Sequence, residues 1–138
     1  MIQRVQTVYL MLSIVFLGIF LAVPSFFEVV EGEIVPFVAS ENMELLLLAG
    51  LPVVLALASI FLFKNRALQI KLGGAALLMT LAVIALVGYY FYTSMQTAQE
   101  VGIAFGLILP PISLILIYLA IRAIKKDEKL VRSADRFR

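Results

Sequence analysis

Residues 72–92 read LGGAALLMTLAVIALVGYYFY, an apolar run that follows the basic segment FKNRALQIK at residues 63–71. At 1.5 Å per residue this run makes a helix of about 30 Å, which matches the hydrocarbon core of a membrane. The run ends in a cluster of aromatic residues, of the kind that gathers at membrane interfaces. The stretch therefore predicts a membrane-spanning helix with a basic segment at one end and an aromatic cluster at the other.

Three further apolar runs have similar lengths. They cover residues 5–23, which end at Pro24, then residues 45–63 and residues 101–124. The composition agrees, since 63% of the residues are hydrophobic and 14% are charged, whereas a soluble domain is roughly half apolar and a quarter charged. The sequence predicts an all-α membrane protein, a four-transmembrane-helix up-down bundle that forms a single domain over residues 1–138.

The charges divide between the two sides of such a bundle. After four crossings every Lys and Arg falls on the side that holds both chain ends, whereas the two loops on the other side carry Glu. The positive-inside rule then predicts a multi-pass protein with both termini in the cytoplasm. The basic residues are Arg4, Lys64, Arg66, Lys71, Arg122, Lys125, Lys126, Lys129, Arg132, Arg136 and Arg138.

Two segments outside the spans have patterns of their own. In the first outer loop, residues 24–44, short β-rich stretches flank Glu31 and Gly32 and predict a β-hairpin. Residues 125–138 form a basic tail in which Glu128 and Arg132 stand one helical turn apart. We expect this tail to be a helix that leaves the membrane on the cytoplasmic side.

Residue types that catalysis needs are scarce. The chain has no Cys and no His, and it has neither a Gly-rich phosphate loop nor a Ser set against a general base. The outer glutamates lack the dense Asp, Asn and Gly spacing of a calcium loop. We therefore expect no enzyme, no cofactor, no metal site and no nucleic-acid partner.

Small residues in the last run predict a helix contact face. Gly102 and Gly106 have GxxxG spacing, and Pro110 and Ser113 continue the same face of a helix that begins near residue 101. We interpret this face as packing within the bundle, with a dimer seam or a kinked gate as the alternative.

A second candidate surface gathers basic and polar side chains at the cytoplasmic end. It is predicted to bind a membrane-protein partner or anionic lipid headgroups, although the same residues also serve to orient the helices. Gln69 is expected to share this surface. The surface comprises Arg4, Lys64, Asn65, Arg66, Lys71, Arg122, Lys125, Lys126, Lys129, Arg132 and Arg136.

Three cytoplasmic segments resemble a known family. They are MIQRVQTVY at residues 1–9, FKNRALQIK at 63–71 and RAIKKDEKLVRSADR at 122–136. Together they are similar to small bacterial four-span proteins described as domain of unknown function 4293. The resemblance implies a four-helix protein of the bacterial inner (cytoplasmic) membrane in Gram-negative species, and it implies no activity.

Two functions are compatible with these patterns. The leading hypothesis is a non-catalytic accessory or scaffold subunit that binds another membrane complex or forms a homo-oligomer. The alternative is a binder or transporter of a lipid or small hydrophobic molecule, in a cleft beside Gly102, Gly106 and Pro110. A scaffold is expected to depend on the basic surface, whereas a transporter is expected to fail when Gly106 is enlarged to Leu.

Overall fold

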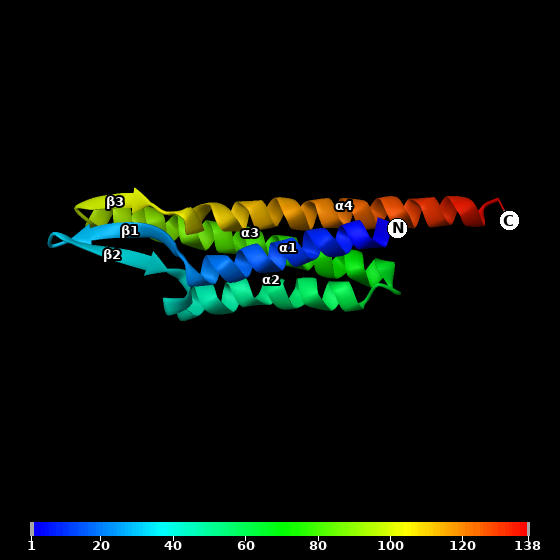
Figure 1. Ribbon diagram of the computed structural model, residues 1–138, viewed down its shortest axis with the longest axis horizontal. Helices are drawn as coiled ribbons and strands as arrows, with labels where there is room; N and C mark the ends of the chain where they lie inside the picture. The colour runs from blue at the N-terminus through cyan, green and yellow to red at the C-terminus, as the bar shows by residue number, and fades with distance from the viewer. Residues whose placement is uncertain (1, 138) are drawn as a thin grey trace.

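The computed structural model describes residues 2–137 and is mostly helical, at 77%. Four helices form one long bundle (Figure 1). They are α1 (Ile2–Ala22), α2 (Met43–Phe61), α3 (Arg66–Thr97) and α4 (Leu109–Asp135). Each helix is long and apolar enough to cross a membrane. Both ends of the chain lie at the same end of the bundle (Figure 1).

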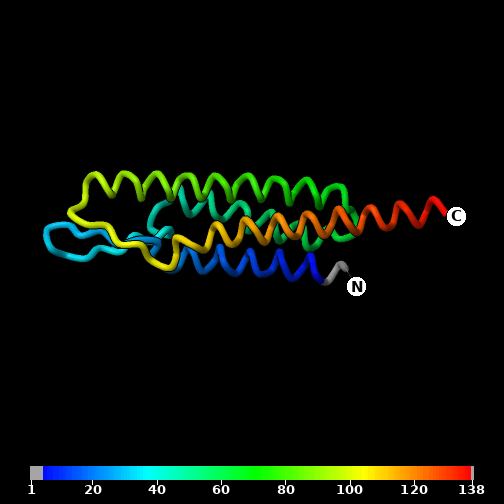
Figure 2. The backbone as a smooth tube through the Cα atoms, turned by 90° about the horizontal axis from the view of Figure 1, so that it is seen from above, coloured from blue at the N-terminus to red at the C-terminus, as the bar shows by residue number. Residues whose placement is uncertain are grey.

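Successive helices run in opposite directions, so the predicted up-down order of the helices is confirmed (Figure 2). α1 packs against α2 and α4, and α3 packs against the same two helices, which closes a ring of four. The core includes Phe20, Leu45, Val83 and Leu109. Only 28% to 33% of each apolar window is buried inside the bundle. The remaining side chains of these windows are partly or fully exposed, which is typical of a protein whose solvent is lipid.

The fourth helix begins later than the sequence predicts. Residues 100–103 are a short strand and Phe105–Ile108 are a 3₁₀ turn, so the α-helix begins at Leu109 and not near residue 101. Pro110 and Pro111 explain this start, because proline lacks an amide hydrogen and is tolerated in the first helical turn. The same helix continues to Asp135. The first part of the segment predicted as a helical tail, as far as Asp135, thus forms the end of α4.

A small sheet forms at the bundle end opposite the chain ends. The predicted hairpin is confirmed, with β1 (Pro24–Val30) antiparallel to β2 (Glu33–Val38). Glu31 and Gly32 have φ angles of 53° and 84°, as a tight two-residue hairpin turn requires. A third strand, β3 (Glu100–Ile103), pairs with the other side of β1 and gives the order β2-β1-β3. This third strand was not predicted.

Aromatic contacts hold the sheet against the last turns of α3. Phe26 of β1 is fully buried. Its ring stacks on Phe37 with centroids 4.3 Å apart and meets Phe91 edge-on at 5.5 Å. The ring of Phe37 in turn lies 5.4 Å from that of Tyr90. The sheet therefore extends the bundle core beyond the end of α1 (Figure 1).

Two hydrogen bonds add to this attachment. The Ser94 hydroxyl of α3 donates to the Glu28 carboxylate of β1. The Tyr90 hydroxyl donates to the carboxylate of Glu44, at the start of α2, over 3.0 Å. Because its final turns contact the sheet, α3 continues to Thr97, past the aromatic residues that end the predicted span.

Candidate functional site

The bundle end that holds both chain ends, here called the basic end, is joined by an ion pair. The Arg66 guanidinium at the start of α3 lies 3.2 Å from the Asp127 carboxylate of α4, and these side chains are 27% and 14% exposed. Beyond Asp127, α4 continues past the other helices (Figure 1). At 1.5 Å per residue, residues 128–135 extend about 12 Å. The ion pair thus marks the place where α4 leaves the bundle.

Charges on α4 are separated by face. Ser113, Ile117, Ala120 and Ile124 are buried at helical spacing, and the partly buried Asp127 continues that face. The cationic side chains are exposed on the opposite side of the helix. We call this cationic side the basic face; it consists of Arg122, Lys125, Lys126, Lys129, Arg132 and Arg136.

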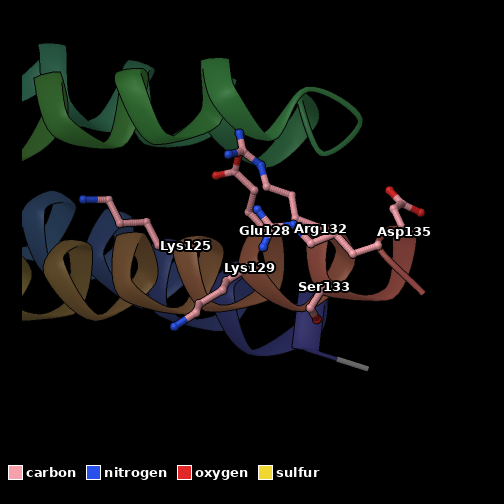
Figure 3. Close-up of a pocket in the computed structure, with 7 residues that line it drawn as sticks. Lys125, Glu128, Lys129, Arg132, Ser133 and Asp135 are labelled. Carbon is pink, nitrogen blue, oxygen red and sulfur yellow. The ribbon is translucent and has the colours of Figure 1, made fainter. Parts of the chain in front are cut away.

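The basic face has few ionic partners within the chain. Arg132 pairs with Glu128 at 2.8 Å, and among the described side chains the other members of the face make no ion pair. An open hollow of about 570 Å³ runs along this stretch of α4. Figure 3 shows Glu128 and Arg132 directed toward the turn between α2 and α3, whereas Lys129 points away from it. Most of the cationic charge is therefore available to another molecule.

The remaining residues of the predicted cytoplasmic surface divide between exposed and structural positions. Lys64 and Lys71 are exposed. Asn65 caps α3, because its Oδ1 accepts a hydrogen bond from the backbone N of Leu68 at 3.1 Å, and Arg66 is held in its ion pair. Arg4 belongs to α1, but its side chain lies outside the described residues. Asn65 and Arg66 thus hold the α2–α3 turn together.

The expectation that Gln69 shares this surface is wrong. Gln69 is buried, and its Nε2 donates to the backbone O of Ser59 at 3.0 Å. The Ser59 hydroxyl donates back to the Gln69 carbonyl at 3.5 Å. The sequence does carry a signal, since Gln69 falls in the 3–4 spacing of Gly73, Ala76 and Thr80, which are also buried. Gln69 therefore joins the end of α2 to the start of α3.

The predicted glycine face does not exist as a helix face. Gly102 lies in β3 and Gly106 lies in the 3₁₀ turn, whereas Pro110 and Ser113 are buried in α4. Gly106 packs directly against β1, so that a Cβ there would lie 2.5 Å from the Pro24 carbonyl oxygen. Enlarging Gly106 to Leu would therefore disturb the fold, and it does not test a cleft.

Ser113 shows how this part of α4 packs. Its hydroxyl donates across the bundle to the backbone O of Ser13 in α1 at 3.3 Å. Two other deep hydroxyls bond within their own helices, Ser13 to the Leu10 carbonyl at 2.7 Å and Thr80 to the Ala76 carbonyl at 2.8 Å. These hydroxyls thus satisfy backbone carbonyls and do not converge on a polar pocket.

An apolar groove lies between α3 and the start of α4, beside Pro110. Its volume is about 200 Å³. Gly88 forms part of its wall, and a Cβ at that position would meet no atom within 4 Å. We call it the lateral groove; it is lined by Ile84, Val87, Gly88, Phe91, Leu107, Pro110 and Pro111.

The chain was compared with known families, curated proteins and solved structures. The model of the family described as Domain of unknown function (DUF4293) matches residues 2–137. The chain belongs to this family. No curated protein and no solved structure matches it. Membership in the DUF4293 family confirms the resemblance seen in the three segments of the sequence, and the family description names no activity.

Among residues 2–137, no three His, Cys, Asp or Glu side chains gather where they could hold a metal ion. The structural features available for function are the basic face, the lateral groove and the sheet. The basic face combines charge, exposure and projection beyond the bundle, which makes it the strongest candidate site.

Proposed function

We propose that this DUF4293 protein spans the bacterial inner membrane four times, with both termini in the cytoplasm, and acts as a non-catalytic accessory or scaffold subunit. The basic face of α4 is the observation that carries the proposal. Its cationic side chains are exposed and mostly without ionic partners, on a helix that projects past its own bundle. Such a surface complements an acidic surface on another membrane complex.

The spacing of charged and aromatic residues supports the membrane arrangement. Arg66 pairs with Asp127, and a Cβ on Gly73 would lie 2.9 Å from Ile121. In that antiparallel register Lys71 and Arg122 lie at about one level. From Lys71 to Tyr89 the helix rises about 27 Å, close to the roughly 30 Å of a hydrocarbon core.

Depth along α4 distinguishes lipid contacts from protein contacts. The headgroup layer is about 6 Å thick on each side of the hydrocarbon core. Arg122 is taken as the edge of the hydrocarbon core. If α4 stands along the membrane normal, Lys125 and Lys126 then lie in the headgroup layer and contact anionic lipid headgroups. Lys129 lies about 10 Å and Arg136 about 21 Å below Arg122. The lower part of the basic face therefore reaches past the lipid, where a protein surface can contact it.

Charge reversal on the lower part tests this function. We expect Lys129→Glu combined with Arg132→Glu and Arg136→Glu to lower partner recovery roughly 100-fold, since each exposed ion pair contributes up to about 1 kcal/mol. The measurement is quantitative mass spectrometry of proteins and lipids that copurify with the tagged chain from its own host in mild detergent. Wild-type protein should recover one partner in stoichiometric amount.

The matched control keeps the charge at the same positions, with Lys129→Arg, Arg132→Lys and Arg136→Lys, and should retain the partner.

The orientation of the chain in the membrane is tested in parallel. Because the chain has no Cys, a single Ser133→Cys or Glu31→Cys can be labelled with a membrane-impermeant maleimide. In cells with a permeable outer membrane, only Glu31→Cys should label. Recovery of lipid alone with wild-type protein, or an unchanged partner in the reversed variant, would contradict the proposal.

A second candidate function, binding of a lipid or small hydrophobic molecule, rests on the lateral groove. Gly88→Leu should fill the groove without a clash, because no atom lies within 4 Å of a Cβ there. If the groove holds a lipid chain, native mass spectrometry should show several-fold less bound lipid in this variant. Gly18→Leu is the matched control, since Gly18 is equally open and lies in α1, away from the groove. Equal lipid in both variants would exclude the groove.

A further inference from the structure

The two faces of strand β1 carry an unusual distribution of polar and apolar side chains. Along β1, Phe26 and Glu28 face α3, as the ring contact with Phe91 and the Ser94 hydrogen bond show. Because side chains alternate along a strand, Phe27 and Val29 face away from α3. Antiparallel sheets at a surface commonly turn apolar residues to the core and polar residues to water. Phe26 follows this rule, whereas the Glu28 carboxylate faces the helix and Phe27 and Val29 face outward.

The neighbouring strands extend this exposed apolar face. Phe27 is paired with Pro36 and Gly102, and Val29 with Ile34 and Glu100. Ile34 is 72% exposed. Figure 2 shows α3 along one side of the sheet and no other described element along the opposite side. We call this opposite side the outward sheet face; it consists of Phe27, Val29, Ile34, Pro36, Glu100 and Gly102.

A hollow of about 400 Å³ lies on the outward sheet face. Its lining includes Phe27 and Val29 of the central strand, and Gly102 leaves it open because a Cβ there would have no neighbour within 4 Å. Glu100 stands in the same lining. The hollow thus combines apolar walls with a carboxylate at one side, which suits an apolar side chain that has a cationic neighbour.

The surrounding charge has one sign. No Lys or Arg occurs between residues 5 and 63 or between residues 72 and 121, so the sheet end has no basic residue of its own. An electrostatic partner for this end must therefore be cationic. The acidic residues at the sheet end are Glu28, Glu31, Glu33, Glu41, Glu44 and Glu100.

We propose that the outward sheet face docks a segment of another protein, in the compartment opposite the cytoplasm, that carries large apolar side chains flanked by Lys or Arg. The apolar side chains fill the hollow above Gly102, and the cations pair with Glu100 at its side. The partner at this end is chemically distinct from the acidic partner proposed for the basic face.

A second copy of the chain cannot supply the cationic segment that the outward sheet face requires. This step rests on the proposed membrane-spanning arrangement, in which two copies can be related only by an axis along the membrane normal. The strands run along the bundle axis (Figure 1), so each residue would meet its own equivalent at the same height. Glu100 would then face Glu100, and like charges at such a contact are unfavourable.

Site-specific photocrosslinking in host cells tests the proposal. Ile34→benzoylphenylalanine carries the probe on the outward sheet face, and Val35→benzoylphenylalanine carries it on the face toward α3, one residue away. We expect one discrete protein adduct from position 34, at a yield at least fivefold above position 35. Sequencing of the cross-linked peptide should show apolar residues next to Lys or Arg.

Glu100→Lys should lower the adduct yield about tenfold, because the reversed charge repels the cation that pairs with Glu100. Glu41→Lys makes the same charge change away from the outward sheet face and should leave the yield unchanged. Both variants carry the Glu31→Cys label to verify orientation, which separates a failure of the proposed topology from a failure of this docking.

Four results would overturn the proposal. They are an adduct with a second copy of the chain, a cross-linked peptide without Lys or Arg, equal yields at positions 34 and 35, and no protein adduct in correctly oriented protein. If Glu31→Cys labels only after the inner membrane is opened, the proposed topology is wrong, and the compartment named for the docking partner is wrong with it.

Discussion

Gly106→Ala is expected to lower the free energy of unfolding by about 3 kcal/mol, the upper range for overpacked sites. The added Cβ would lie 2.5 Å from the Pro24 carbonyl oxygen and 3.1 Å from the Ser25 Cα. These are backbone atoms, so relief of the clash requires β1 to move away from the 3₁₀ turn. Thermal unfolding in detergent should show a midpoint lower by roughly 10 °C.

Gly102→Ala provides the control for this prediction. Its Cβ would meet nothing within 4 Å, so we expect a change within about 0.5 kcal/mol. A GxxxG helix face would instead make both glycines sensitive, because both would lie in a helix contact. Equal destabilisation by the two substitutions would therefore favour a helical segment and contradict the strand and turn described above.

Phe26→Ala should have the second large effect, a loss of about 3 to 5 kcal/mol. Phe26 is fully buried between the stacked ring of Phe37 and the edge of Phe91, so its removal leaves a cavity between the sheet and α3. Hydrogen exchange at the amides of β1 and β3 should accelerate strongly, while amides in the middle of the bundle should change little.

The adjacent residue serves as the comparison. Phe27 lies on the outward sheet face and is only half-buried, so Phe27→Ala should cost less, about 1 kcal/mol. The two substitutions remove the same side chain from neighbouring positions, so their difference reports which face of β1 is packed. A larger loss from Phe27→Ala would mean that the face assignment is reversed.

Much of the fold was accessible from the sequence because its signals are local. Apolar runs predicted four helices that could cross a membrane, and Glu31 with Gly32 predicted the hairpin turn. Strand β3 was missed because Val101, Gly102 and Ile103 continue an apolar run, and short apolar runs do not separate strand from helix. Only pairing with β1, far away in the chain, decides their conformation.

The charges of the candidate site could be predicted from the sequence, but its contacts could not. Clustering along the chain is enough to find the basic residues of α4 and their position relative to the termini. The ion pair of Arg66 with Asp127 and the bonds between Gln69 and Ser59 depend on helix register. That register is set by packing over the whole bundle, which a single apolar pattern does not encode.

The strand order has a consequence for synthesis. β1 is made early and β3 only after α3, yet β1 lies between β2 and β3. During translation one edge of β1 therefore keeps unpaired backbone groups until residues 100–103 have been made. Exposed strand edges of this kind invite pairing with other chains. By pairing with β1, the last strand thus joins the first pair of helices to the second and covers the strand edge that was open until then.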